Sequence, residues 1–322
     1  MNFEDLNWDI LDRLRATFLE GKPSRRAYWT CDEDLAQYDV TFGERIGWKW
    51  DAVLADLRDI GWTPPAAVDR VLDWGCGSGV AGRRVLQAYP TLHTLQLHDR
   101  SPCAVGFAAR RAREAFPAIA VHPMETAPDT AHGAVVVLSH VCNELDPRAE
   151  ARLLSLVATA SAVLWVEPGT HAVSRRLQGF RQRLKDSHDI IAPCTHASSC
   201  PLLARGRERD WCHQFATPPP RAFTDGHWVR FARRAGIDLR SLPFAWLVLA
   251  SQEGGDPKPG REAWSRVVGR LRVGRNGATG VVCSSSGIED LQITRDAWRS
   301  LTSAGVPENV SRLHRERLPP RP

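Results

Sequence analysis

The feature that most constrains this 322-residue chain is a short apolar run that ends in an acid and leads into three glycines. The run covers Val71 to Asp73, and Gly75, Gly77 and Gly79 follow it at alternate positions. Glycine lets the backbone turn tightly after a strand and leaves room for a ligand to approach the main chain. The pattern predicts a strand, a tight turn and a helix that begins near Val80, with a ligand bound over the turn.

The spacing of the glycines indicates which ligand to expect. Dinucleotide enzymes carry GxGxxG, but Val80 stands where the third glycine of that motif would be, which favours S-adenosylmethionine over NAD. The next apolar run ends at Asp99, the separation at which an acid accepts hydrogen bonds from ribose hydroxyls. A tight turn and an N-capping aspartate are the purely structural alternative. The predicted cofactor-binding residues are Asp73, Gly75, Cys76, Gly77, Gly79, Asp99 and Ser139. Of these, Cys76 is expected to fill the loop rather than act as a nucleophile.

Short apolar runs alternate with helical periodicity through the middle of the chain. The runs cover residues 70–73, 94–97, 119–121, 134–138 and 162–166. Such alternation is typical of a parallel sheet wrapped by helices on both faces. We therefore predict an α/β fold of the class I methyltransferase type, a Rossmann-like doubly wound sheet with a helical N-terminal cap and a C-terminal metal-binding extension.

Periodicity and composition divide the chain into four predicted parts. Helical spacing at 2–19 and 44–60 predicts the cap over residues 1–65, and the cofactor-binding core follows over 66–189. Residues 190–310 are predicted as a cysteine-containing loop with C-terminal strands that complete the fold, and 311–322 as a basic mobile tail. Within the third part, we expect a helix at 225–235 and strands at 244–250, 267–273, 280–284 and 290–294.

Polar residues follow the run that ends at Leu138, where ligands bind in open α/β sheets. His140 is a candidate base, and Asn143 or Glu144 are candidates for positioning a methyl acceptor. The same residues also suit the start of an ordinary helix, so the catalytic role stays open.

Three thiols and two imidazoles fall within twenty residues, in a stretch without clear periodicity. They are Cys194, His196, Cys200, Cys212 and His213. A loop so rich in soft ligands is typical of a metal site, and Cys283 on a predicted strand is the candidate fourth thiol. Zinc with cysteine or mixed ligands and an iron-sulfur cluster both suit this set, and scattered reduced cysteines are the third possibility.

Charge and hydropathy bear on partners and location. The formal net charge is +5, and arginines cluster at 110–113 and 175–183, which suits a phosphate-facing surface or a solvated helix face. The chain has no apolar run of roughly 20 residues, so we expect no membrane partner. The first 21 residues lack the order of a signal peptide, which predicts a cytoplasmic protein with reduced thiols.

The chain resembles the ribosomal small-subunit methyltransferase-like family, which includes a mitochondrial small-subunit assembly factor and shorter bacterial relatives. The resemblance covers roughly residues 71–298. Its most specific elements lie at 139–145, 166–170, 192–202, 210–215 and 281–283.

The resemblance implies a four-iron four-sulfur cluster held by Cys194, Cys200, Cys212 and Cys283, contact with small-subunit ribosomal RNA, and a role in ribosome assembly or translation. The expected protein is thus a methyltransferase that acts on or binds this RNA. A non-catalytic assembly factor that uses the fold as an RNA-binding platform, and a methyltransferase for a small molecule or peptide, are the alternatives. The acceptor atom and the oligomeric state are not determined by the sequence.

Overall fold

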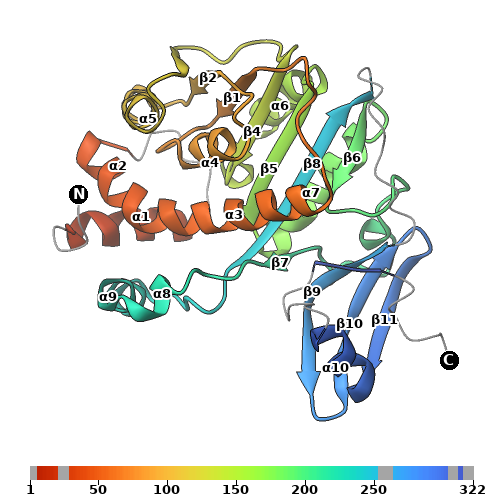
Figure 1. The fold of residues 1–322 in the computed structure, drawn as a ribbon. Helices are drawn as coiled ribbons and strands as arrows, with labels where there is room; N and C mark the ends of the chain where they lie inside the picture. The colour runs from red at the N-terminus through yellow and green to blue at the C-terminus, as the bar shows by residue number, and fades with distance from the viewer. Residues whose placement is uncertain (1–5, 21–28, 253–263, 304–310, 315–322) are drawn as a thin grey trace.

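The computed structural model describes residues 6–20, 29–252, 264–303 and 311–314. Two sheets form its framework (Figure 1): a central one in the order β3-β2-β1-β4-β5-β8-β6, with β7 beside β8, and a smaller one in the order β11-β10-β9-β12. The strands are β1 (Arg70–Trp74), β2 (Thr94–His98), β3 (Ala120–Met124), β4 (Ala134–Ser139), β5 (Ala162–Pro168), β6 (His188–Ala192), β7 (Gln214–Phe215), β8 (Pro243–Ser251), β9 (Trp264–Gly274), β10 (Gly277–Ser284), β11 (Gly287–Thr294) and β12 (Arg312–His314). The helices are α1 (Trp8–Glu20), α2 (Asp32–Tyr38), α3 (Glu44–Asp59), α4 (Val80–Ala88), α5 (Pro102–Ala115), α6 (Pro147–Ala158), α7 (His171–Leu184), α8 (Arg221–Thr224), α9 (Gly226–Ala235) and α10 (Arg295–Ser303), with short helical turns η2 (Asp39–Gly43), η3 (Cys142–Glu144) and η4 (Pro201–Leu203).

The central sheet is mostly parallel, and its chain order reverses beside β1. Val71 on β1 pairs with Leu95 on β2 and with Val135 on β4, both in parallel register. Because β2 and β4 leave β1 on opposite sides, a crevice opens at the carboxyl end of β1, where doubly wound sheets bind ligands. Strand β8 lies antiparallel between β5 and β6. The five runs predicted as parallel strands are β1 to β5.

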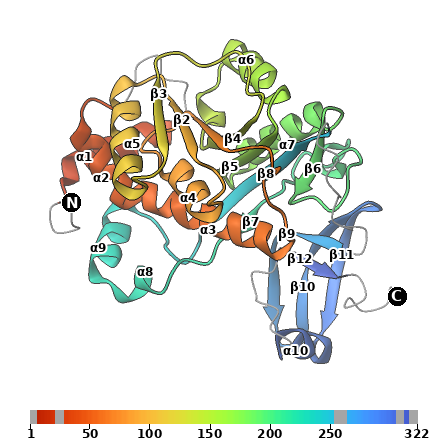
Figure 2. The same cartoon turned by 45° about the horizontal axis from the view of Figure 1, so that its top comes forward.

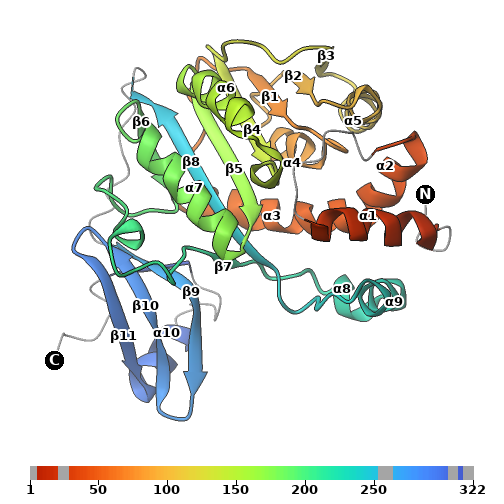
Figure 3. The same cartoon turned by 180° about the vertical axis from the view of Figure 1, so that it is seen from behind.

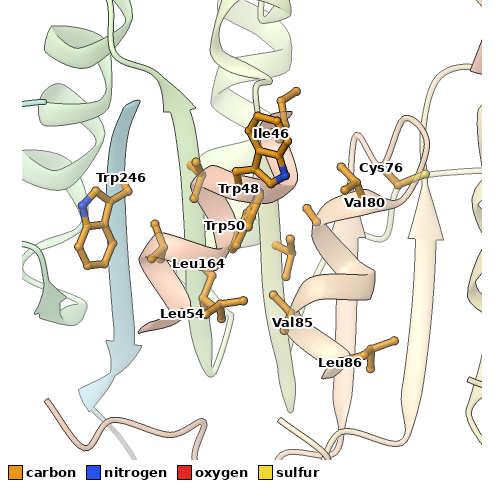
Figure 4. Packing of buried hydrophobic residues seen from close by; sticks show 14 of the residues in the cluster. Ile46, Trp48, Trp50, Leu54, Cys76, Val80, Val85, Leu86, Leu164 and Trp246 are labelled. Carbon is orange, nitrogen blue, oxygen red and sulfur yellow. The ribbon is translucent and has the colours of Figure 1, made fainter. Parts of the chain in front are cut away.

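Helices cover both faces of the central sheet, which explains why its inner strands are apolar throughout. Strand β4 is buried at five of its six positions. Alternate residues point to opposite faces, so Val135 and Val137 pack with α3 and α4, whereas Val136 and Leu138 pack with α6 and α7. Figure 3 shows α6 and α7 over one face, and Figure 4 shows Trp50 and Leu54 of α3 against the other.

The N-terminal helices pack against the central sheet and against a helix far along the chain. Trp48 on α3 meets Trp228 on α9 with ring centroids 4.6 Å apart, and Phe42 meets Phe231 at 5.1 Å. The helix expected at 44–60 is α3, and the one expected at 2–19 begins at Trp8. Residues 2–5 of that expectation lie outside the described residues.

The second sheet has its own apolar core, and Figure 2 shows it projecting away from the central sheet. Val267, Val282 and Ile293 lie in that core with Trp298 of α10. The region expected to complete one fold, residues 190–310, therefore divides between two sheets: β8 enters the central sheet, and β9 to β11 form the second. In the second sheet, β10 lies between β9 and β11 and pairs antiparallel with both.

The segment predicted as a mobile tail begins with a strand. Residues 312–314 form β12, which pairs antiparallel with the edge of β9. Ser311 donates a hydrogen bond to Asp56 Oδ1 at 2.6 Å, and Arg312 forms an ion pair with the same carboxylate at 2.6 Å. These contacts explain the order of residues 311–314, and residues 315–322 lie outside the described residues. Within the described ranges, every helix is too short or too polar to span a bilayer.

Candidate functional site

A cavity of about 1220 Å³ opens at the carboxyl ends of β1, β2 and β4. The glycine loop, the polar residues after β4 and the helices α1 and α3 all contribute to its wall. A volume above the roughly 300–1,000 Å³ of ordinary ligand pockets leaves space for two ligands side by side. This cavity is the strongest candidate for the active site.

Backbone geometry shapes the glycine loop. Gly75, Gly77 and Gly79 have φ angles of +72°, +51° and +77°, which side chains other than glycine rarely adopt. The amides of Gly75 and Cys76 both donate to the carbonyl of His98, at 2.7 and 3.0 Å. The loop is thus fixed to the end of β2, which explains why the two ligand-binding motifs lie close together.

The glycines of this region serve two different purposes. A Cβ at Gly75 would lie 2.8 Å from Val141 Cγ1, and one at Gly79 would lie 2.8 Å from Ala108 Cβ, so these glycines allow close packing of the chain. A Cβ at Gly77 would meet no described atom within 4 Å, and Gly77 lines the cavity. Gly77 therefore keeps space open for a ligand.

Asp99 lies at the edge of this space. Its Oδ2 accepts a hydrogen bond from the Gly77 amide at 3.0 Å, and its Oδ1 accepts one from the Ser101 amide at 2.9 Å. Burial raises the pKa of Asp99, while the two amides act against that shift. The carboxyl group is held rigidly beside Gly77 and faces the cavity, as a ribose-binding acid must.

Asp73 takes a different position from Asp99. It is fully buried, and its Oδ2 accepts a hydrogen bond from the Gly82 amide of α4 at 3.0 Å. Burial raises its pKa to about 7. Asp73 and Gly79 do not line the cavity, whereas Gly75, Cys76, Gly77, Asp99 and Ser139 do. Asp73 thus anchors α4 beneath the loop.

For two residues that line the cavity, the structure indicates the protonation state or the hydrogen bond of the side chain. Burial raises the pKa of Cys76 well above its ordinary value, so this thiol stays protonated and is a poor nucleophile. Ser139 accepts a hydrogen bond at its Oγ from Trp50 Nε1 at 3.0 Å. Trp50 is buried on α3, so the wall beside Ser139 is rigid.

His140 is strained and faces a lysine. Its φ angle of +58° is the only positive one among described residues other than glycine. Such backbone strain is concentrated at functional sites. The His140 Nε2 lies 3.3 Å from Lys49 Nζ, and burial together with the charges of Lys49 and Arg45 holds the pKa of His140 well below its usual value. The imidazole is therefore neutral at physiological pH.

The other two candidate catalytic residues also reach the cavity. Asn143 and Glu144 lie on the turn η3 and line the wall. Glu144 forms an ion pair with Arg100 at 3.0 Å, and both side chains are about one-third exposed. The structure thus brings His140, Asn143 and Glu144 to one cavity.

Glu167, which sequence reasoning missed, supports this segment from below. It is fully buried at the end of β5, and its Oε1 accepts hydrogen bonds from the amides of Val141 and Cys142 at 3.0 and 3.1 Å, and from Trp165 Nε1 at 2.7 Å. Burial raises the pKa of Glu167 to about 7. A single acid at the end of an apolar strand was the signal for this role.

The N-terminal helices supply a second group that the sequence interpretation left without a role. Arg15 on α1 and Arg45 and Lys49 on α3 line the cavity. Arg45 and Lys49 stand four residues apart, hence on one helical face, and they interrupt an otherwise apolar stripe. That interruption was the available signal, but a helix alone does not reveal what its face meets.

The four predicted metal-binding cysteines lie close enough together, near the junction of the two sheets, for their charges to affect one another. The thiols of Cys194, Cys200 and Cys212 each raise the pKa of Cys283, after the larger effect of burial. Burial, followed by Cys194 and Cys212, raises the pKa of Cys200 to about 11. In the described part of the chain, no group of three or more Cys, His, Asp or Glu side chains has the arrangement of a metal site.

Two buried arginines lie beside these thiols. Arg181 Nε lies 3.2 Å from Cys194 Sγ, and Arg266 Nε lies 3.3 Å from Cys212 Sγ. Both side chains are about 2% exposed, and neither forms an ion pair with a carboxylate among the described residues. Arg181 Nη1 and both terminal nitrogens of Arg266 have no hydrogen-bond partner. Two buried cations therefore face the thiols without a full set of partners.

The two candidate imidazole ligands differ in position. His196 Nε2 lies 3.5 Å from Cys283 Sγ, within the group of thiols. His213 stacks on Trp211 with ring centroids 4.8 Å apart and an interplanar angle of 16°. Its ring also lies against Gly269, where a Cβ would approach within 3.2 Å. Of the two, His196 is therefore better placed than His213 to join the thiols.

A mostly parallel sheet in this strand order, with a glycine loop after β1 and an acid after β2, is the class I methyltransferase fold. Residues 44–298 match the sequence model of the family Rsm22, described as mitochondrial small ribosomal subunit Rsm22. The chain belongs to this family. The family match confirms the resemblance predicted from the sequence, but it does not test the predicted iron-sulfur cluster.

Other comparisons add little to this assignment. No curated protein matches the chain. One similar solved structure is magnesium protoporphyrin IX methyltransferase from Synechocystis PCC 6803 with bound SAH, at 14% identity and a TM-score of 0.38, covering 75% of this chain and 97% of that one. Another is the methyltransferase domain of bacterial CtHen1, at 13% identity and a TM-score of 0.37, covering 64% and 98%.

Proposed function

We propose that this protein is an S-adenosylmethionine-dependent methyltransferase that acts on RNA of the small ribosomal subunit. The observation that carries the proposal is the open space at Gly77 beside Asp99, at the edge of a cavity of about 1220 Å³. The family description supplies the link to the small subunit.

The proposed cofactor site uses the loop and the two strand ends. The backbone at Gly75, Cys76 and Gly77 lies under the cofactor, Asp99 accepts hydrogen bonds from its ribose, and Ser139 contacts it from β4. S-adenosylmethionine, when bound, supplies a methyl group on a positively charged sulfur. Within this proposal, Asp73 and Gly79 shape the loop without touching the cofactor.

The chain's own contribution to the reaction is mainly positioning. Alignment of the acceptor with the methyl group supplies most of the acceleration in such transfers. Glu167 fixes the backbone at Val141 and Cys142, which places Asn143 and Glu144 along the cavity wall. His140 is neutral, and the burial and neighbouring charges that lower its pKa also disfavour its protonation, so within this proposal its imidazole positions the acceptor rather than taking up a proton.

We further propose that Cys194, Cys200, Cys212 and Cys283 hold a metal centre, a four-iron four-sulfur cluster as the resemblance implies, with zinc as the alternative. Four thiolates around either centre carry net negative charge. The buried guanidinium groups of Arg181 and Arg266 beside two of the sulfurs support this, because a buried cation needs a counter-charge. The centre is a structural one that joins the two sheets.

The test measures cofactor binding first and methyl transfer second. Titration calorimetry with S-adenosylhomocysteine should give binding to the wild-type protein, and Asp99→Ala should weaken it at least tenfold because the ribose loses its acceptor. Purified small-subunit RNA and radiolabelled cofactor then report transfer. Methyl incorporation that Asp99→Ala abolishes supports the enzyme. Salt-dependent RNA binding without incorporation supports the platform instead, and incorporation into small molecules alone contradicts the RNA acceptor.

A further inference from the structure

Three cations gather on one wall of the cavity. Arg15 comes from α1, and Arg45 and Lys49 come from α3, one helical turn apart. They act on one another: the charge of Arg15 lowers the pKa of Arg45, and the charge of Arg45 lowers that of Lys49, in each case after the larger effect of burial. Like charges are thus held close together at the edge of an open space.

These cations lack the partners that other arginines of the same region have. Arg83 forms an ion pair with Asp39 at 2.6 Å, and Arg84 forms one with Glu44 at 3.0 Å. Arg15 and Arg45, by contrast, have no hydrogen bond or ion pair within the described residues, and Arg45 Nε is buried without a partner. Lys49 Nζ contacts the neutral ring of His140, at 3.3 Å from its Nε2.

Acids around the cavity do not neutralise this wall. Glu167 is the carboxyl group whose charge acts on Lys49, but its Oε1 is occupied by three donors and burial raises its pKa to about 7. Asp99 is bound to the Gly77 amide, Glu144 is paired with Arg100, and Asp146 caps α6 through the Ala149 amide. Asp129 is exposed. An excess of positive charge therefore remains on this wall of the cavity.

The geometry points to an anion subsite: Arg15, Arg45 and Lys49 receive a phosphate group of the nucleotide that accepts the methyl group. This inference rests on the proposed function, since it places the acceptor beside the cofactor. The carboxylate of the cofactor is the competing ligand, but its charge lies beside the cofactor's own ammonium group, whereas a phosphate of the RNA backbone carries its negative charge with no cation attached. The cavity volume also leaves space for a second ligand.

Binding of simple probes to the full chain tests the subsite. With S-adenosylhomocysteine saturating, the four nucleoside 5′-monophosphates and their parent nucleosides are titrated into the wild type, Arg45→Gln, Arg45→Lys and the surface control Arg113→Gln. We expect at least one monophosphate to bind tenfold or more tightly than its nucleoside in the wild type and in Arg113→Gln. Arg45→Gln should remove that advantage, and Arg45→Lys should retain most of it because the charge stays.

A second titration separates the two sources of negative charge. S-adenosylhomocysteine is compared with methylthioadenosine, which lacks the amino-acid part, in the wild type and Arg45→Gln. A change below twofold for both supports the acceptor subsite. A tenfold loss for S-adenosylhomocysteine alone would assign the cations to the cofactor carboxylate and overturn the inference, as would equal binding of nucleotides and nucleosides to the wild type. Failure of the wild type to bind S-adenosylhomocysteine at all would instead reject the proposed function.

Discussion

The cavity and the cysteine junction, where Cys194, Cys200, Cys212 and Cys283 lie, both contain buried cations, yet they are built in different ways. At the cavity, consecutive residues of one loop shape the floor, and Arg45 faces open space without a partner. At the junction, Cys283 comes from β10, far along the chain from the other three thiols, and Arg266 points its Nε at Cys212 Sγ, 3.3 Å away. The floor of the cavity is thus shaped by local backbone, whereas the junction depends on how two sheets pack.

The largest expected effect is loss of the metal centre at the cysteine junction. Cys200→Ser should lose the metal centre, because one of four thiolate ligands is removed. Iron, acid-labile sulfide and zinc are measured on protein purified without oxygen, with Cys103→Ser outside the junction as the control. About four irons and four sulfides per chain in the wild type and the control, and none in the variant, would support the cluster. A wild-type protein that holds neither iron nor zinc would show that the cysteine junction is not a metal site.

The next largest expected effect is on ligand binding at the cavity. Gly77→Ala should weaken S-adenosylhomocysteine binding roughly 100-fold, because a φ of +51° strains alanine and its methyl group enters the ligand space. Gly179→Ala is the matched control, since Gly179 lies within α7 and a Cβ there meets nothing within 4 Å. Equal binding by both variants would show that the loop does not hold the cofactor.

Lys49, on the cavity wall, makes the stability of the protein depend on pH. Burial lowers its pKa to about 7 in the folded protein, from an ordinary value near 10.5. Between these values the unfolded chain binds more protons than the folded one, so the lysine's contribution to stability rises as pH increases from 7 towards 10.5. Lys49→Met should therefore gain stability relative to the wild type at pH 6, and that gain should shrink by about 2.5 kcal/mol at pH 9.

Urea denaturation at the two pH values measures this difference. Lys185→Met is the matched control, because it removes a lysine from a surface ion pair with Asp186. A stability difference between Lys49→Met and the wild type that is the same at pH 6 and pH 9 would contradict a depressed pKa in the folded protein.

The smallest expected effect has opposite signs in the two metal states. Arg266→Met should destabilise the metal-loaded protein by about 1–2 kcal/mol, because the thiolate-bound centre loses a buried counter-charge. In metal-free protein, the same change should be neutral or stabilising, because it removes a buried cation with unpartnered nitrogens. Thermal unfolding of both forms is the measurement, and a change of the same sign in both would separate Arg266 from the metal centre.

Local sequence determined most of the elements and the floor of the cavity. The apolar run before Asp73 became β1, and the glycine spacing predicted a turn whose φ angles only glycine readily adopts. Periodicity also placed α3 and the strand at 244–250, which is the centre of β8. These features depend on neighbours within a few residues, so a pattern in the sequence is enough to reveal them.

Tertiary structure decided which side chains share a site. Asp73 lies near the end of β1 and Asp99 directly follows β2. A hydrogen bond with α4 holds Asp73 away from the cavity, while the Gly77 amide holds Asp99 at its edge. Packing of α3 brings Lys49 to His140, 91 residues away, and pairing of the second sheet brings Arg266 beside Cys212. Periodicity indicates that a face is buried, but the partner on the other side is selected by the packing of distant elements.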